Sequence, residues 1–101
     1  MSPLTTQPFD PAEYLDDSEA IAAYLTEALA TEDPAFIADA LGVVARAHGM
    51  SEIALQSGLS RESLYRALSP DGNPEFATVL RVLRAMGLRL STNPIEERKI
   101  A

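Results

Sequence analysis

The chain has 101 residues, which fits one compact domain, and it is 47% hydrophobic but only 6% aromatic, so any core must consist mostly of Ala, Leu, Val and Ile. It contains no Cys and a single His, which excludes a disulfide framework, a thiolate metal site and a histidine cluster. The net charge of −7 argues at first against a nucleic-acid partner, because phosphate contacts require Lys or Arg.

The charge is unevenly distributed along the chain. Residues 1–40 contain nine acidic residues and neither Lys nor Arg, whereas residues 41–92 contain six Arg against four acidic residues, and residues 93–101 are neutral in sum. Such asymmetry suggests two partners of opposite charge. The alternative is that the acidic residues merely cover a solvated helix face.

The N-terminal residues 1–16 are predicted to form an arm with a short helical turn, because Asp10 and Pro11 are a typical helix-start pair. This segment has neither the basic region nor the apolar run of a signal peptide, and no stretch reaches the roughly 18 apolar residues of a membrane span. We therefore expect a cytoplasmic protein without membrane association.

Two helices are predicted next. The first runs from about residue 17 to Thr31, with Asp16 or Asp17 as cap, and the second runs from Asp33 and Pro34 to Gly49. Their apolar residues recur at offsets of three and four, as in helices with one buried face. The predicted buried residues are Ile21, Tyr24, Leu25, Ala28 and Leu29 in the first helix, and Phe36, Ile37, Ala40, Leu41, Val44 and Ala45 in the second. His48, at the negative end of the second helix, is interpreted as a surface residue.

Residues 50–69 contain the most informative pattern, two short helical segments around one glycine. Ala54 is small where two helices would cross closely, and Gly58 suits a turn with positive φ. Ser51 and Ser60 are the predicted caps of the two segments, and Ile53, Leu59 and Leu64 are predicted to be buried together. The pattern predicts a helix-turn-helix within a compact five-helix, all-α domain.

A last helix is predicted after the turn-forming residues 69–74, with Asn73 as cap, Pro74 as first residue and Gly87 as end. Its predicted buried residues are Phe76, Val79, Leu80, Leu83 and Met86. Residues 88–92 alternate between apolar and polar types, which is typical of a short β-strand. Its partner would be residues 4–8 or the same segment of a second subunit. Residues 17–92 are thus the predicted domain, and residues 93–101 a flexible tail.

The second segment of the motif, at about residues 61–68, is predicted to read DNA. Arg can donate paired hydrogen bonds to guanine, Glu can accept one from cytosine, and Ser and Tyr suit phosphate or water-mediated contacts. The N–H groups at helix starts also favour an anion. The candidate DNA-binding residues are Ser51, Ser60, Arg61, Glu62, Ser63, Tyr65 and Arg66. Glu52 is left out because an acid repels phosphate, and the alternative for the whole motif is an ordinary helical hairpin.

Residues 8–92 resemble the HigA-like family of probable addiction-module antidote proteins, helix-turn-helix antitoxins of the lambda repressor and Cro type. The resemblance rests on FDPAEYLDDSEAIAAYLTEAL and on the block from ALGVVARAHGM to VLRAMGLRL, and residues 60–73 are its most specific part. It implies a cytoplasmic prokaryotic antitoxin that binds a small basic toxin of the RelE/ParE type and represses its own operon as a dimer. By matching positions it assigns Ser60, Arg61, Glu62, Tyr65 and Arg66 to the DNA-reading helix. The family's usual long side-chain donor near the start of the preceding helix is absent, since Ser51 and Glu52 stand there.

The resemblance also suggests a use for the acidic N-terminal part, because a basic RNA-cleaving toxin presents a positive surface that an acidic partner would cover. The toxin-binding candidates are Asp16, Asp17, Glu19 and Glu27. A homodimer is expected because one short helix reads few bases, and two copies about 34 Å apart would reach successive major grooves. The last helix and residues 88–92 are its candidate contact surface.

No glycine-rich phosphate loop and no nucleophile beside a base is recognisable, so the chain is predicted not to be an enzyme, and no cofactor, metal or small-molecule ligand is expected. The adjacent Asp16 and Asp17 would point about 100° apart on a helix, which suits capping better than acid–base chemistry. Two alternative functions share the motif. One is a stand-alone repressor of the phage type without a toxin partner, and the other is an interaction protein whose motif no longer touches DNA.

Overall fold

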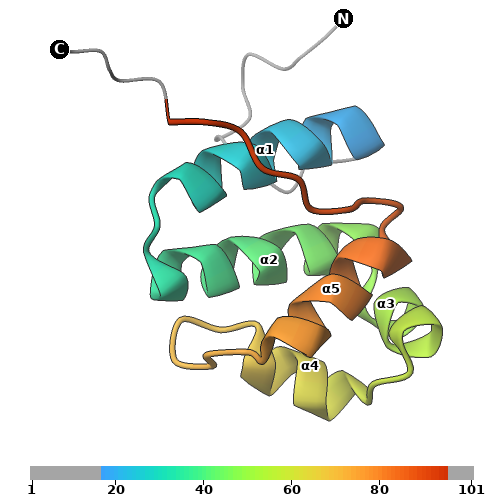
Figure 1. Ribbon diagram of the computed structural model, residues 1–101. Helices are drawn as coiled ribbons and strands as arrows, with labels where there is room; N and C mark the ends of the chain where they lie inside the picture. The colour runs from blue at the N-terminus through green and yellow to red at the C-terminus, as the bar shows by residue number, and fades with distance from the viewer. Residues whose placement is uncertain (1–16, 96–101) are drawn as a thin grey trace, which may run out of the picture.

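A computed structural model describes residues 17–95 of the chain. Five helices follow one another there: α1 (Ser18–Ala30), α2 (Pro34–His48), α3 (Met50–Ser57), α4 (Arg61–Ala67) and α5 (Phe76–Ala85). No residue of this part of the chain forms a strand, which confirms the predicted all-α domain of five helices (Figure 1). The predicted N-terminal arm with its turn at Asp10 and Pro11 lies outside the described residues. Of the predicted tail at residues 93–101, residues 93–95 are exposed without regular secondary structure, and the rest lies outside the described residues.

The first two helices start where their capping residues predict. The Asp17 carboxylate accepts a hydrogen bond from the Ala20 N–H at 2.7 Å, so Asp17, rather than Asp16, caps α1. The Asp33 carboxylate accepts from the Ala35 N–H at 3.1 Å, and Pro34 is the first residue of α2. Each carboxylate satisfies an N–H group that has no partner inside its helix, which sets the boundary.

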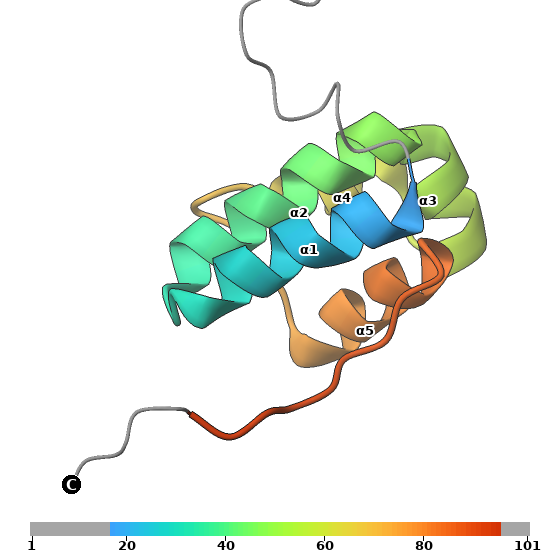
Figure 2. The same ribbon diagram turned by 90° about the horizontal axis from the view of Figure 1, so that it is seen from above.

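All five helices contribute to one core. α1 packs on α2, α2 on α3, and α3 on both α4 and α5. Figures 1 and 2 show α1 running beside α2, with α4 on the far side of α2 from α1. The buried core residues are Ile21, Leu25, Ala28, Ala40, Leu41, Val44, Ala45, Met50, Ile53, Leu64, Leu68, Val82, Leu83 and Met86.

Four predicted core residues are instead exposed. Leu29 is 39% exposed, Phe36 50%, Phe76 67% and Leu80 42%, whereas Ala38 of α2 and Val82 of α5 are buried. Offsets of three and four along a helix fit two neighbouring faces equally well. The helices packed against α2 and α5 select which of these faces is buried, and in both helices it is rotated from the predicted one.

The start of α5 also differs from its prediction. Asn73 adopts a left-handed φ of 46°, whereas a capping residue needs an extended conformation. Glu75 takes the capping position without a side-chain hydrogen bond, and α5 begins at Phe76. The turn before it is confirmed, since the Gly72 N–H donates to the Ser69 carbonyl at 2.9 Å.

The predicted strand at residues 88–92 is wrong for the single chain. The alternation that suggested it is real, because Leu88 and Leu90 are half-buried against the core while Arg89 and Ser91 are exposed. A strand, however, requires a neighbouring strand as hydrogen-bond partner. The described residues supply none, and residues 4–8 lie outside them.

Candidate nucleic-acid interface

The first helix of the predicted motif follows α2 directly. Gly49, with a φ of 119°, ends α2 and also occupies the position before α3. The predicted cap at Ser51 is therefore wrong: the buried Met50 is the first residue of α3, and no side chain caps this helix. Ser51 instead lies exposed in the first turn, next to N–H groups that the helix leaves free.

The turn between α3 and α4 spans residues 58–60, as predicted. Gly58 has a left-handed φ of 79°, and its N–H donates to the Ala54 carbonyl at 3.0 Å. A Cβ at Gly58 would meet nothing within 4 Å, so the positive φ alone requires glycine here. The buried Ser57 hydroxyl accepts from the Leu59 N–H at 3.3 Å, which closes the turn on its inner side.

α4 is held at both ends. At its start, the Ser60 hydroxyl accepts from the Ser63 N–H at 3.0 Å, which confirms Ser60 as cap. Leu64 is fully buried and Leu68 nearly so. At its end, the backbone of α2 comes so close that a Cβ on Gly42 would lie 2.3 Å from the Leu68 carbonyl oxygen. The orientation of α4 is therefore set by a cap, an apolar anchor and a backbone contact.

The opposite face of α4 is polar and open to solvent. Arg61, Glu62, Tyr65 and Arg66 are exposed, and Ser63 is half-buried. The Arg61 guanidinium lies over the Tyr65 ring, with its carbon 5.8 Å from the ring centre and one nitrogen 3.5 Å from the Tyr65 hydroxyl. These two contacts hold Arg61 beside Tyr65 and leave the other N–H groups of the guanidinium for a ligand.

The structure thus brings six of the seven candidate DNA-binding residues together on α4 and its cap. Ser51 lies apart from them on α3. A residue that the sequence analysis did not consider is Gln56, which is exposed in the last turn of α3 and donates its side-chain N–H to the Glu52 carboxylate. The spacing of four residues within a predicted helix could have indicated this side-chain pair from the sequence. The bond to Gln56 partly satisfies the Glu52 carboxylate within α3.

The toxin-binding candidates lie on α1, away from α4. Glu19 and Glu27 are exposed on this helix, Asp17 is engaged as its cap, and Asp16 lies outside the described residues. Because α1 and α4 lie on opposite sides of α2, the two candidate surfaces do not overlap (Figure 1).

Two further properties concern residues 17–95 only. No three His, Asp or Glu side chains gather there in a way that would hold a metal ion. No helix in this range is both long and apolar enough to cross a membrane. Two surface hollows adjoin each other along α1, one against α2 and α5 and the other against residues 88–95.

The sequence matches the family model of the probable addiction module antidote proteins over residues 5–94. The chain belongs to this family. An uncharacterized protein of Haemophilus influenzae, strain Rd, is 51% identical over 81 residues, which are 80% of this chain and 84% of that protein. No solved structure matches the chain.

Membership in an antidote family supports the role of an antitoxin and implies a toxin as partner. The predicted resemblance is confirmed at the level of the addiction-module antidotes. Its HigA-like and lambda-type details stay predictions.

Proposed function

We propose that the chain neutralises a toxin of the RelE/ParE type and represses its own operon by placing α4 in the major groove of operator DNA. The observation that carries the DNA-binding part is the geometry of α4, whose apolar side is anchored by Leu64 while its opposite side is polar and exposed. A major groove about 12 Å wide admits a helix presented in this way.

The residues of α4 have distinct roles in this proposal. Arg61 donates paired hydrogen bonds to a guanine, and Glu62 accepts one from a cytosine. Arg66 and the hydroxyls of Ser63 and Tyr65 contact phosphates or bridging waters. Ser51 and Ser60 bring the starts of α3 and α4 toward the DNA backbone, where free N–H groups attract phosphate.

The overall charge of −7 is compatible with DNA binding because its sources are separated. Glu19 and Glu27 lie on α1, across α2 from the proposed DNA-reading helix. They would face a basic toxin while α4 faces DNA. Cytoplasmic localisation, a non-enzymatic role and a homodimer with two copies of α4 about 34 Å apart belong to the same proposal.

Titration of the chain against its own promoter fragment at moderate salt tests the DNA-binding part. We expect Arg61→Ala to cost about 1–3 kcal/mol of binding free energy and to relax the preference for one base pair. Arg66→Ala should weaken binding less. Arg46→Ala, which removes an exposed arginine of α2 outside both α4 and the candidate dimer surface, is the control and should change little. Equal affinities of the Arg61 and Arg46 variants would contradict the assignment of α4.

Co-expression with the neighbouring reading frame tests the toxin part. A tight complex is the expected result. Operator binding without any such complex would favour a stand-alone repressor instead.

A further inference from the structure

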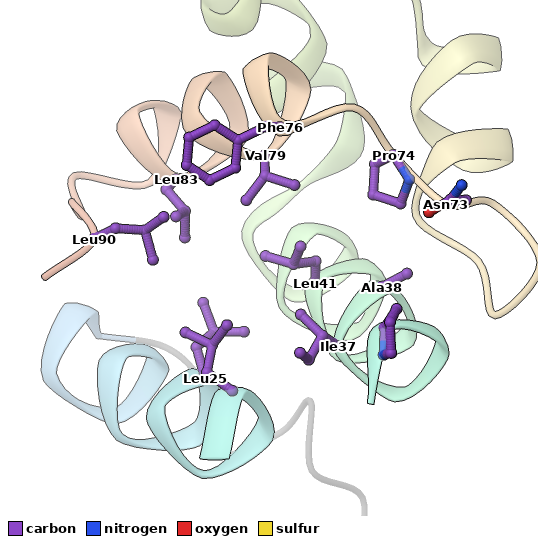
Figure 3. Close-up of a pocket in the computed structure, with 12 residues that line it drawn as sticks. Leu25, Ile37, Ala38, Leu41, Asn73, Pro74, Phe76, Val79, Leu83 and Leu90 are labelled. Carbon is purple, nitrogen blue, oxygen red and sulfur yellow. The ribbon is translucent and has the colours of Figure 1, made fainter. Parts of the chain in front are cut away.

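An apolar groove of about 240 Å³ opens between α1, α2 and α5. Among its lining residues are Leu25 and Leu29 of α1, Ile37 and Leu41 of α2, and Phe76 and Val79 of α5. Figure 3 shows the side chains of Leu25, Ile37, Leu41, Phe76 and Val79 converging on it. Asn73 is the one polar residue in the lining, and no Lys or Arg takes part. We call this hollow the α1–α5 groove.

The groove has an exposed apolar rim. Phe76 is 67% exposed and Leu29 39%, and neither belongs to the buried core. Because α4 is anchored through the core residues Leu64 and Leu68, the exposed Leu29 and Phe76 do not fix its orientation. Large apolar side chains that gather around a hollow and remain open to water are typical of a surface that a partner covers.

A second and more polar hollow adjoins this groove. It has a volume of about 510 Å³, lies along α1 and shares Leu25, Leu29, Leu83 and Leu90 with the first. Glu32 and Arg89 are among its other lining residues. Since Leu90 lines both hollows, one segment of polypeptide can cross from the groove into the second hollow.

Acidic residues flank the lining residues Pro34 and Phe76 in the chain. Glu32 and Asp33 lie in the turn just before the lining residue Pro34, and Glu75 lies between Pro74 and Phe76 in the chain. All three are exposed. A segment that enters here is favoured if Lys or Arg flank its apolar side chains. A second copy docked symmetrically on this groove would instead bring two acidic rims together, because the same patch faces itself across a two-fold axis.

We propose that the α1–α5 groove binds a segment of the toxin in which apolar side chains are flanked by Lys or Arg. This inference rests on the proposed antitoxin function and assigns part of the toxin contact to residues outside the acidic candidates of α1. It also leaves α4 free for DNA.

The test measures binding of the full chain to the purified product of the neighbouring reading frame. We expect the double variant Leu29→Lys/Phe76→Lys to bind this protein about tenfold more weakly or worse, since it places charge on both rim positions. Glu32→Lys/Glu75→Lys should weaken binding as well, and more at low salt than at high salt. The matched control is Leu55→Lys, which alters a 79% exposed leucine on α3 and should leave the affinity unchanged.

Circular dichroism, operator binding and light scattering of the same variants complete the experiment. Native helix content, unchanged operator affinity and an unchanged oligomeric state are expected. Equal toxin affinity of the double variant and the unaltered chain would overturn the inference while the antitoxin function stands. A loss that accompanies a change of oligomeric state would also overturn it, because the groove would then bind a second copy. No binding by the unaltered chain would contradict the proposed function and the inference with it.

Discussion

Gly42 and Gly87 lack a side chain for different physical reasons. Gly42 lies inside α2, where a Cβ would come within 2.3 Å of the Leu68 carbonyl oxygen at the end of α4. Gly87 follows α5 with a φ of 79°, and a Cβ there would meet nothing within 4 Å. Gly42 is thus required by a contact between two helices, and Gly87 by its own backbone conformation.

This difference predicts two kinds of defect. Gly42→Ala should lower the free energy of unfolding by about 1–3 kcal/mol, because the clash with a backbone atom pushes α4 from α2. It should also weaken operator binding. Gly87→Ala should cost about 1–2 kcal/mol for its left-handed φ but leave the operator affinity of the folded protein unchanged. Urea unfolding and operator titration of both variants measure this, and a Gly42 variant as stable as the unaltered chain would refute the close approach.

Helix α4 depends on its surroundings for stability. It has seven residues, too few for a helix to be stable on its own in water. Its first turn is held by the Ser60 hydroxyl and its inner side by Leu64. Ser51 of α3, by contrast, accepts no capping hydrogen bond.

The two serines therefore form a matched pair for a stability measurement. Ser60→Ala should lower the free energy of unfolding by about 1 kcal/mol, because it leaves the Ser63 N–H without its partner. For a domain of this size that corresponds to a fall in Tm of about 4–8 °C. Ser51→Ala should change the unfolding free energy by less than about 0.5 kcal/mol. Thermal unfolding of both variants is the measurement. Equal losses of stability at the two positions would contradict the capping role of Ser60.

The candidate DNA and toxin surfaces lie on opposite sides of α2 (Figure 1). Glu19→Lys/Glu27→Lys should weaken toxin binding without altering operator binding, because the changed charges lie on α1. The effect should shrink as salt is raised, since exposed charges are screened over about 10 Å at 0.1 M salt. Titrations of toxin and operator at two salt concentrations measure this. A parallel loss of both activities would mean that the two surfaces are not independent.

The proposed dimer can be tested on the surface formed by α5 and residues 88–92. Leu80 of α5 is 42% exposed and lies beside Leu88 and Leu90, on the surface expected to contact a second copy. We expect Leu80→Glu to convert the dimer to a monomer and to weaken operator binding, whereas Leu55→Glu on α3 should leave the oligomeric state unchanged. Light scattering at micromolar concentration is the measurement. A monomeric unaltered chain, with and without DNA, would rule the dimer out.

The exposed face of α4 was predictable residue by residue. Once Gly58 and Ser60 define the turn and the cap, the register of the next seven residues follows, and Arg61, Glu62, Tyr65 and Arg66 are exposed as expected. Ser51 is exposed near a helix start, as its position in the sequence indicates. It does not cap α3, because Gly49 joins α2 directly to α3. That these side chains contact DNA stays a prediction.

Local signals in the sequence specify the starts of α1, α2 and α4 and the turn at Gly58, because Asp17, Asp33 and Ser60 each bond to an N–H only two or three residues away. Three other features depend on the packing of distant segments: Phe76 faces water while Val82 is buried, residues 88–92 form no strand with any part of residues 17–95, and α1, α2 and α5 enclose an apolar groove. The two groups of features differ in the distance along the chain over which their interactions act. A cap or a positive φ is satisfied within one turn of chain, whereas the burial of a helix face depends on which distant segments pack against it.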